Sequence, residues 1–464
     1  MSSVPQCGVR SGVGADESWH RQTPSAILGR LRDRSFLGIV RFKAKLVLSS
    51  AVLWTAVGSA PAQAEGPLTA ITLQDAYQRA LDRSEDTGIA QQNIEQAEVT
   101  RRATWVAIAP QASITGFGLV QNRAPFVQSP QLQAEGRVLQ PIFRRGFFAS
   151  REAAHFGVEA ATLFLERARQ QVMLDVTTAF VAVLRSRQAV LVADAAVQRA
   201  EAQVSSATAR VQAGGALRTA QLQATISFRQ AQVDRVRIGQ DLKIQELEFE
   251  RLVGIGPPAT LSLPVTPALP GLAEAVASSL ERKDLRALQQ QASAARALEQ
   301  SLGGLRWPRL DLLFRYDQAY PRNPPIPPSS EGLPLTVQGI AQLTLPLFQG
   351  GDEFFRVEAQ RVIAEVALLR THQLVKQIAE QLRSALSELE TAKRSFALAE
   401  LQIKDAQENY ALVTTQFKLR TVTFLEVATA QSALTNAENL LLISNFDREL
   451  AAYRLLFAIG TLQL

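Results

Sequence analysis

A short joint at which a strand-like sequence pattern changes into a helix-like one occurs twice in this chain of 464 residues. The first joint is Gln140–Gly146 (QPIFRRG) and the second is Leu345–Gly351 (LPLFQGG). Apolar and polar residues alternate before each joint, and apolar residues recur at every third or fourth position after it, so each joint leads from a strand into a helix. Pro346 follows Pro141 by 205 positions, which predicts a duplicated chain. The residues expected to make the joints are Pro141, Gly146, Pro346 and Gly350.

The segment after each joint predicts a very long helix. Between the first joint and the turn at Gly214 and Gly215 there is no proline, and Gly157 is the only internal glycine. This predicts a helix over Gly146–Gln212, about 100 Å long. The corresponding second helix runs to about Phe417 and carries an unbroken apolar seam with steps of three and four: Ile378, Leu382, Ala385, Leu389, Ala392, Phe396, Ala399, Ile403, Ala406, Tyr410, Val413 and Phe417. Such a heptad seam indicates coiled-coil packing, and an ordinary two-stranded coiled coil would produce the same seam.

Shorter elements complete each half, so the fold class is mainly α with a small β part, built as a duplicated repeat of long helices and a β-hairpin. The helices expected are Leu73–Ile108, capped by Thr72 and Asp75, then Ala216–Val253, Leu272–Arg306 and a last one ending at Ile459. The strands expected are Gln111–Val120, one ended by Pro141, one from Leu310 and Val337–Leu345, with loops over Asn122–Pro130 and Pro321–Pro334. In each half the two shorter helices together match the long one in length, which predicts that they stack end to end beside it.

The N-terminal segment has the pattern of a secretory signal. Arg41, Lys43 and Lys45 precede the apolar run Leu46–Val57, and an Ala-x-Ala motif ends at Ala64. An N-terminal membrane anchor is the alternative, although the run is shorter than the ~20 residues that a span needs. The predicted organisation is therefore 1–64 N-terminal extension and signal peptide, 65–254 first repeat, 255–271 linker and 272–464 second repeat.

Charge and composition exclude several classes of function. Residues 1–64 contain eight Lys or Arg and three Asp or Glu, so removing them lowers the formal net charge from +6 to +1. The excess of basic residues therefore lies mostly in the leader, and the sequence predicts no nucleic acid partner. The only cysteine, Cys7, is lost with the leader, and the histidines, His20, His155 and His372, have no metal-site spacing. No pairing of a nucleophile with a base and no phosphate loop is present. The sequence predicts no enzyme, no metal and no cofactor.

The strands indicate a membrane environment that one chain cannot satisfy alone. Each strand has about ten residues, the length of a tilted strand that crosses a bilayer. Four strands cannot close a barrel, and open sheet edges do not occur in lipid, so several chains must share one barrel. Small soluble hairpins are the alternative. Aromatic residues gather where the strands meet the helices, which predicts a membrane-interface girdle, with core packing as the alternative. The candidates are Trp105, Trp307, Phe143 and Phe348.

The chain resembles the TolC-type outer membrane efflux protein family (outer membrane factors). The motifs that carry the resemblance are Leu73–Ala76 with Ala80–Leu81, Pro110 and Pro308 before the strands, QPIF and LPLF at the joints, and Ala458–Gly460. The resemblance implies a homotrimer with a twelve-stranded transmembrane β-barrel, four strands per chain, joined to a periplasmic α-barrel tunnel. It implies a passive exit duct in outer membrane lipid. The implied partners are a periplasmic adaptor (membrane fusion) protein and an inner-membrane pump of the resistance-nodulation-division, ABC or major-facilitator type. The alternative is a secreted or periplasmic coiled-coil scaffold or adaptor without a pore.

The resemblance also implies roles at the two periplasmic helix tips. Members carry an Arg-aromatic-x-x-Gly turn, for which this chain has Arg210 and Gly214 in the first tip, and Arg420 in place of the glycine in the second. Glu426 aligns with a carboxylate that rings the aperture. The aperture candidates are Arg210, Gly214, Arg420 and Glu426. If the second tip needs a positive φ at Arg420, arginine costs more than glycine there; a differently shaped turn is the alternative. The side chain is either a polar contact for the adaptor or a solvated loop charge.

Overall fold

The computed structural model describes residues 70–119, 131–258, 260–261, 269–321 and 335–462. The chain divides into two units, Met1–Gly66 and Pro67–Leu464, and every described residue lies in the second. The predicted leader and the loop Asn122–Pro130 lie outside the described residues, as does the predicted loop Pro321–Pro334 apart from its first residue.

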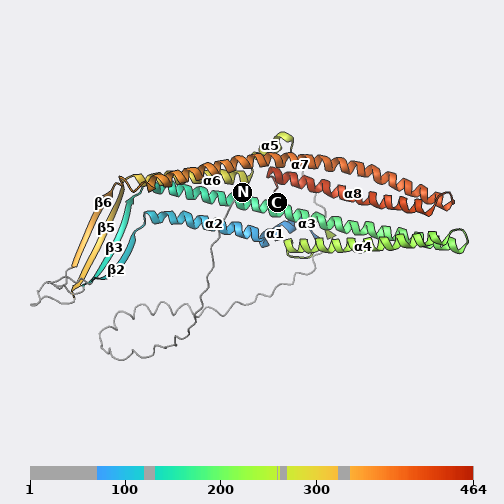
Figure 1. Ribbon diagram of the computed structural model, residues 1–464, viewed down its shortest axis with the longest axis horizontal. Coiled ribbons are helices and arrows are strands. Elements are labelled where there is room, and N and C mark those ends of the chain that lie inside the picture. The colour runs from blue at the N-terminus through green and yellow to red at the C-terminus, as the bar shows by residue number, and fades with distance from the viewer. Residues whose placement is uncertain (1–69, 120–130, 259, 262–268, 322–334, 463–464) are drawn as a thin grey trace, which may run out of the picture. The chain divides into compact units, whose positions relative to one another are not determined.

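The two halves have the same order of elements (Figure 1). The first half contains α1 (Leu73–Arg83), α2 (Glu85–Ala103), a 3-10 turn (Thr104–Ala107), β2 (Gln111–Leu119), β3 (Gln131–Phe143), α3 (Gly146–Gln212) and α4 (Arg218–Val253). The second contains α5 (Leu272–Leu280), α6 (Lys283–Gly303), a 3-10 turn (Gly304–Arg306), β5 (Arg309–Pro321), β6 (Leu335–Thr344), α7 (Asp352–Lys418) and α8 (Phe424–Ile459). Helices α3 and α7 have 67 residues each, and α4 and α8 have 36 each. The exact boundaries of the repeats stay predictions.

The prediction of one helix over Leu73–Ile108 is wrong, because the chain breaks at Ser84. Thr72 and Asp75 form the predicted capping box at the start of α1. Ser84 then adopts an extended backbone (φ −63°, ψ 124°), and its hydroxyl accepts a hydrogen bond from the N–H of Thr87 at 3.4 Å. Ser84 therefore ends α1 and caps the N-terminus of α2. Serine favours such cap positions because its hydroxyl hydrogen-bonds to nearby backbone groups and so competes with a continuous helix.

The prediction of one helix over Leu272–Arg306 is also wrong, and here the cause is a distant contact. The chain leaves the helical conformation between α5 and α6, where Arg282 has φ −52° and ψ 140°. The side chain of Arg282 is buried and donates a hydrogen bond to the carbonyl oxygen of Ala458, at the end of α8. A single continuous helix would give Arg282 a different direction, so the break is coupled to this burial.

The shorter helices pack end to end along the long ones, as predicted. Helices α1, α2 and α4 contact α3, and α6 and α8 contact α7. Helix α1 also contacts α4, and α5 contacts α8, where the shorter helices meet. All residues of the predicted α7 seam from Ile378 to Phe417 are buried or half-buried. The main core lies at the level where the shorter helices meet, and combines α1, the middle of α3 and α7, and the C-terminal ends of α4 and α8.

Among the described helices, α3 alone is long and apolar enough to cross a membrane by length and composition. Its fully buried residues Val176, Phe180 and Val183 belong to the main core, together with Tyr77 of α1 and Phe249 of α4. Packing against other helices therefore accounts for its apolar character.

The larger sheet is an antiparallel meander with the order β2-β3-β5-β6 (Figure 1). The short strands β1 (Ala70–Ile71) and β4 (Thr260–Leu261) pair separately and in parallel. The prediction that Pro141 ends its strand is wrong, because β3 continues to Phe143. The pairing of β3 with β5 shifts between Pro141 and Phe143, and such an irregularity accommodates a residue that lacks an N–H. By contrast, β6 stops at Thr344, just before Pro346.

Candidate functional site

The sheet has one apolar face. Residues paired across antiparallel strands point to the same side of the sheet, so the register assigns each side chain to a face. The apolar face includes Ala112, Ile114, Gly136, Val138, Leu312, Phe314, Tyr316, Val337, Gly339, Ala341 and Leu343. The register also places two polar residues on this face, Gln140 toward the helices and Gln318 toward the loops. Several of these side chains are open to the surroundings, with Ile114 89% exposed and Val337 72% exposed. A continuous, exposed apolar sheet face requires a cover or a lipid environment.

The opposite face carries two rows of polar and charged residues, which we call the charged rows. The row nearer the helices is Ser113, Arg137, Arg315 and Gln338, and the row nearer the loops is Thr115, Glu135, Asp317 and Thr336. Arg315 joins the rows, with its Nε 2.8 Å from Asp317 and 3.4 Å from Glu135. Closer to the helices the same face also carries Leu139, Leu313 and Ile340. An apolar face backed by a charged one is the alternation of a strand layer that separates lipid from water.

The first joint depends on a close approach of backbones. A Cβ added to Gly146 would come within 3.0 Å of the carbonyl oxygen of Ser301, and a Cβ added to Gly304 would lie 2.5 Å from the backbone nitrogen of Gly146. The start of α3 therefore lies directly against the end of α6. Arg144 anchors the same region through an ion pair of 2.8 Å with Asp311, which is buried in β5. This pair was not predicted from the sequence.

The second joint uses glycine for a different reason. Gly350 and Gly351 have φ of 72° and 85°, in the left-handed region that favours glycine. An added Cβ would meet nothing within 4 Å at Gly350. The two joints thus share a sequence pattern, but glycine permits close packing at Gly146 and a backbone turn at Gly350.

The predicted girdle aromatics lie where the sheet meets the helices. Trp105 and Trp307 are about half exposed, and Phe143 and Phe348 are exposed as well. The ring of Trp105 is 5.3 Å from that of buried Phe147, whereas the guanidinium of Arg145 lies 3.6 Å above the ring of Trp307. Their proposed role at a membrane interface stays a prediction.

The tip between α3 and α4 ends α3 with a left-handed residue. Gly214 has φ 70°. Its N–H donates to the carbonyl oxygen of Val211 at 3.1 Å, and the N–H of Gly215 donates to that of Arg210 at 2.8 Å. This pair of bonds is a Schellman motif, which satisfies the last carbonyl groups of a helix.

The tip between α7 and α8 has the same motif with arginine in the left-handed position. Arg420 has φ 64° and is the only residue other than glycine with a positive φ among the described residues. Its N–H donates to Phe417 at 3.2 Å, and the N–H of Thr421 donates to Gln416 at 3.0 Å. Arg420 therefore occupies the position of Gly214, so the two tips turn alike and the alternative of a different turn is wrong. Its guanidinium lies against Gly215 of the other tip, where an added Cβ would be 3.1 Å from Nη2.

A contact joins the two tips at the end of the helices away from the sheet (Figure 1). Arg210 donates a hydrogen bond of 3.0 Å to the carbonyl oxygen of Phe417, and its guanidinium lies 4.2 Å above the Phe417 ring. Phe417 in turn meets Phe424 of α8 edge to face, at 6.2 Å between ring centroids. Phe424 is buried with Ala207 and Ala224 of the first hairpin. The aromatic ring of the second tip thus contacts the arginine of the first.

Glu426 has a local partner. The carboxylate of Glu426 accepts a hydrogen bond from the N–H of Thr423 at 3.1 Å, and the two residues form a capping box at the start of α8. The Thr-x-x-Glu spacing in the sequence is itself a signal for this box. The side chain of Glu426 is exposed at the tip, so it combines a capping role with a solvent-facing charge. Glu426 lies six positions after Arg420, and the corresponding position of the first half, six after Gly214, is Ala220, which has no carboxylate.

An ionic cluster around the buried Arg282 fixes the C-terminal end of α8, and no local sequence pattern predicts it. Arg282 is 3% exposed and pairs with Asp284 at 2.6 Å, while Nε of Arg167 lies 3.6 Å from the same carboxylate. Arg282 and Arg167 also donate to the carbonyl oxygens of Ala458 and Phe457, at 3.0 and 3.1 Å. Two cations therefore cap the negative end of the helix dipole.

Burial and charge shift the pKa values inside this cluster. Desolvation, reinforced by the neighbouring Arg282, lowers the pKa of Arg167 to about 10. Burial acts to raise the pKa of Asp284, but the hydrogen bonds and charges of Arg282 and the charge of Arg167 outweigh it, and the pKa lies below its ordinary value. Asp284 is therefore held as the shared counter-ion of two arginines.

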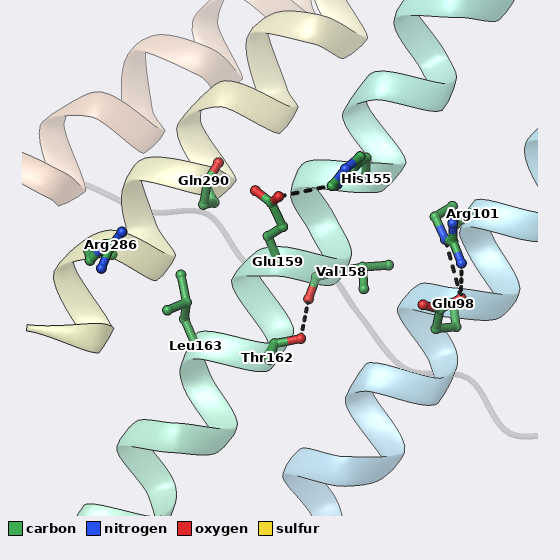
Figure 2. A pocket seen from close by; sticks show the side chains of 9 residues that line it. All are labelled: Glu98, Arg101, His155, Val158, Glu159, Thr162, Leu163, Arg286 and Gln290. Carbon is green, nitrogen blue, oxygen red and sulfur yellow. Dashed lines mark hydrogen bonds and ion pairs between the residues drawn. The ribbon is translucent and has the colours of Figure 1, made fainter.

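The helical part contains a shallow pocket between α2, α3 and α6, lined in part by His155 (Figure 2). Nδ1 of His155 is 3.5 Å from the carboxylate of Glu159 on the same helix, and Glu98 pairs with Arg101 on α2. Both carboxylates in this pocket thus face a side chain of their own helix, the imidazole of His155 for Glu159 and the guanidinium of Arg101 for Glu98. Across the described ranges, no group of three or more His, Cys, Asp or Glu side chains is placed to hold a metal ion.

Comparisons with known proteins agree with this geometry. A family model described as "Outer membrane efflux protein" matches residues 276–461. CusC has a TM-score of 0.74 at 15% identity, over 84% of this chain and 92% of CusC. The CmeC outer membrane channel of Campylobacter jejuni gives 0.71 at 13%, over 84% and 85%, and the outer membrane protein VceC of Vibrio cholerae gives 0.71 at 16%, over 84% and 96%. No curated protein sequence matches the chain.

At these identities the solved structures show the fold, and the family match covers the second half of the chain. The matched segment runs from α5 to the end of α8 and includes the second joint and tip. The first half repeats the same order of elements. Residues 276–461 are thus similar in sequence to outer membrane efflux proteins, and the chain has the fold of the outer membrane channels whose structures are known.

Proposed function

We propose that the protein is the outer membrane exit duct of an efflux or secretion system, through which substrate passes without an energy source of its own. The observation that carries this proposal is the two-faced sheet with unpaired edges. Strands β2 and β6 are terminal in the order β2-β3-β5-β6, and one face is apolar while the other carries the charged rows. Open edges cannot persist in lipid, so β2 of one copy must pair with β6 of another.

Three copies would close a twelve-stranded barrel with the charged rows facing water and the apolar face in lipid. The long helices would extend from the four strands of each copy into the periplasm, and the helix tips at the far end would form the entrance of the duct. The solute would be delivered there by an inner-membrane pump through a periplasmic adaptor. The family match over residues 276–461 and the apolar sheet face argue against the alternative of a soluble scaffold without a pore.

Cysteine cross-linking between copies tests this arrangement directly, because the only natural cysteine, Cys7, lies in the predicted leader. Ser113→Cys on β2 is combined in turn with Thr336→Cys, Gln338→Cys or Gln342→Cys on β6, all on the charged face. Outer membranes are oxidised and analysed on non-reducing gels. We expect at least one pair to give covalent dimers and trimers.

The matched control is Ile114→Cys with the same β6 partners, because Ile114 points to the other face. It should give no cross-link with a partner that reacts with Ser113→Cys. A protein recovered only in the soluble periplasmic fraction, or one in which no pair reacts, contradicts the shared barrel.

A further inference from the structure

The charged rows separate opposite charges along the strands. The row nearer the helices contains the cations Arg137 and Arg315, which are directly paired positions of β3 and β5. The next row toward the loops contains the anions Glu135 and Asp317, which are also directly paired. Two residues along a strand correspond to about 7 Å. The screening length of physiological salt is about 8 Å, so a passing ion experiences the two rows in succession.

The four charges are not equally neutralised. Arg315 contacts both carboxylates, at 2.8 and 3.4 Å. Arg137 is exposed, and it forms no ion pair with any residue in the described part of the chain. Two like charges at directly opposed positions destabilise a sheet. Arg137 thus lacks the compensation that Arg315 has, and it offers its guanidinium to whatever occupies the water-filled side of the sheet.

We propose that the charged rows form a two-layer electrostatic filter in the pore, in which Arg137 determines specificity by favouring anionic solutes at the inner layer. This rests on the proposed function, because only a closed barrel turns the rows into rings. In a barrel of three copies, the inner ring holds six guanidinium groups and the outer ring six carboxylates, with Arg315 connecting them. Rings of charged side chains select ions in this way, and substitutions on the water-filled side of a barrel alter selectivity.

The first experiment measures the reversal potential of purified protein in planar bilayers under a KCl gradient. Arg137→Gln leaves one cation against two carboxylates in each copy, so we expect the ratio of chloride to potassium permeability to fall at least twofold. The double variant Glu135→Gln with Asp317→Asn leaves two cations, so we expect this ratio to rise by a similar factor. The control Gln338→Asn lies in the same row as Arg137 and should leave the ratio unchanged.

A second experiment keeps all four charges and so does not depend on the folding of charge variants. Ser113→Cys places a thiol in the cationic row and Thr115→Cys places one in the anionic row. Each is treated with an anionic and a cationic methanethiosulfonate reagent of similar size. We expect the rate ratio of anionic to cationic reagent to be several-fold higher at position 113 than at position 115.

The outcomes separate the inference from the proposed function. Normal single-channel conductance with unchanged permeability ratios, or equal reagent ratios at positions 113 and 115, overturns the filter while the duct stands. A correctly inserted protein that conducts no ions overturns the duct and the filter with it.

Discussion

At the scale of single residues, Arg420 shows how a repeated fold can tolerate a costly substitution. Its backbone has the left-handed conformation that Gly214 adopts in the other tip. That conformation costs a residue with a Cβ roughly 1–2 kcal/mol relative to the right-handed one, and glycine is spared this cost. The guanidinium of Arg420 gains contact with Gly215, which offsets part of the strain.

Replacing Arg420 with glycine should therefore stabilise the second tip. We expect Arg420→Gly to slow hydrogen exchange of the amides of Arg420 and Thr421, corresponding to about 1 kcal/mol of added local stability. Arg420→Ala keeps the strain and loses the guanidinium contact, so it should speed exchange. If Arg420→Gly exchanges faster than the parent, the contact with Gly215 outweighs the backbone strain.

The half-buried carboxylate of Asp284 gives a pH-dependent contribution to stability. Its pKa in the folded protein lies below the ordinary value, so its contribution is complete above about pH 4 and is lost as the pH falls through the folded pKa. We expect Asp284→Asn to lower the thermal midpoint at pH 7, and to lower it less at pH 3, since the parent loses the same interaction there. Breaking a buried pair costs roughly 3–5 kcal/mol.

The control for Asp284 is Glu166, whose carboxylate pairs with Lys283 at 2.8 Å on the surface. An exposed pair contributes about 0–1 kcal/mol. Glu166→Gln should therefore change the thermal midpoint little at either pH. Equal losses for both variants at pH 7 would show that the cluster around Arg282 does not hold the end of α8.

At the scale of elements, the two joints make the same transition with different physical requirements. Gly146 allows α3 to touch the end of α6, whereas Gly350 and Gly351 supply a left-handed turn before α7. The shared pattern of proline, phenylalanine and glycine in sequence thus conceals two packing solutions. Each solution predicts a different response to the addition of a methyl group.

We expect Gly146→Ala to destabilise the protein by at least 2 kcal/mol, because the added Cβ meets the carbonyl oxygen of Ser301 and backbone cannot move aside as a flexible side chain can. Gly88→Ala is the control, since Gly88 is an exposed residue of α2 with nothing within 4 Å of an added Cβ. It should stabilise α2 by about 0.5–1 kcal/mol. The unfolding midpoint in denaturant measures both, and a stabilised Gly146→Ala variant would contradict the close approach.

Much of the element order could be predicted from the sequence because it follows from periodicity and from the absence of proline. The bounds of α3 are those predicted, and the seam of α7 is buried as expected. The break at Arg282 could not be predicted, because its cause is a partner 176 positions away on α8. The break at Ser84 had a local signal, a serine followed by acidic residues, within an otherwise continuous helical pattern.

The candidate site was predicted unevenly for a similar reason. Single strands revealed alternation, but the charged rows depend on the pairing of β3 with β5, which a strand pattern does not specify. Arg210, Gly214 and Arg420 were identified through the resemblance, whereas the contact of Arg210 with Phe417 required the two hairpins to lie together.

At the scale of the whole molecule, the proposed barrel places the apolar face of the sheet against lipid and the face with the charged rows against water. Ile114 and Thr115 are adjacent in β2 and point to opposite faces, so they form a matched pair. We expect Ile114→Arg, on the apolar face, to cost about 2–4 kcal/mol in the membrane and to deplete trimers from the outer membrane. Thr115→Arg, beside Glu135, should assemble normally.

The amount of heat-modifiable trimer in outer membrane fractions measures both variants. The opposite ranking, with Thr115→Arg depleted and Ile114→Arg unaffected, would place lipid on the charged face. Equal amounts of both would indicate that neither face meets lipid.

The end-to-end meeting of the shorter helices has a mechanical consequence. Each half has one continuous helix, α3 or α7. Beside it lies a row of shorter helices that is interrupted where α1 meets α4 or α5 meets α8. At such an interruption only the continuous helix resists bending, so the bending stiffness of the half falls most sharply there. The cluster of Arg167, Arg282 and Asp284 lies at this level. It connects α3, the start of α6 and the end of α8, and so bridges the break between the shorter helices of the second half. A bending motion that moves the tips relative to the sheet must therefore strain the contacts of this cluster first.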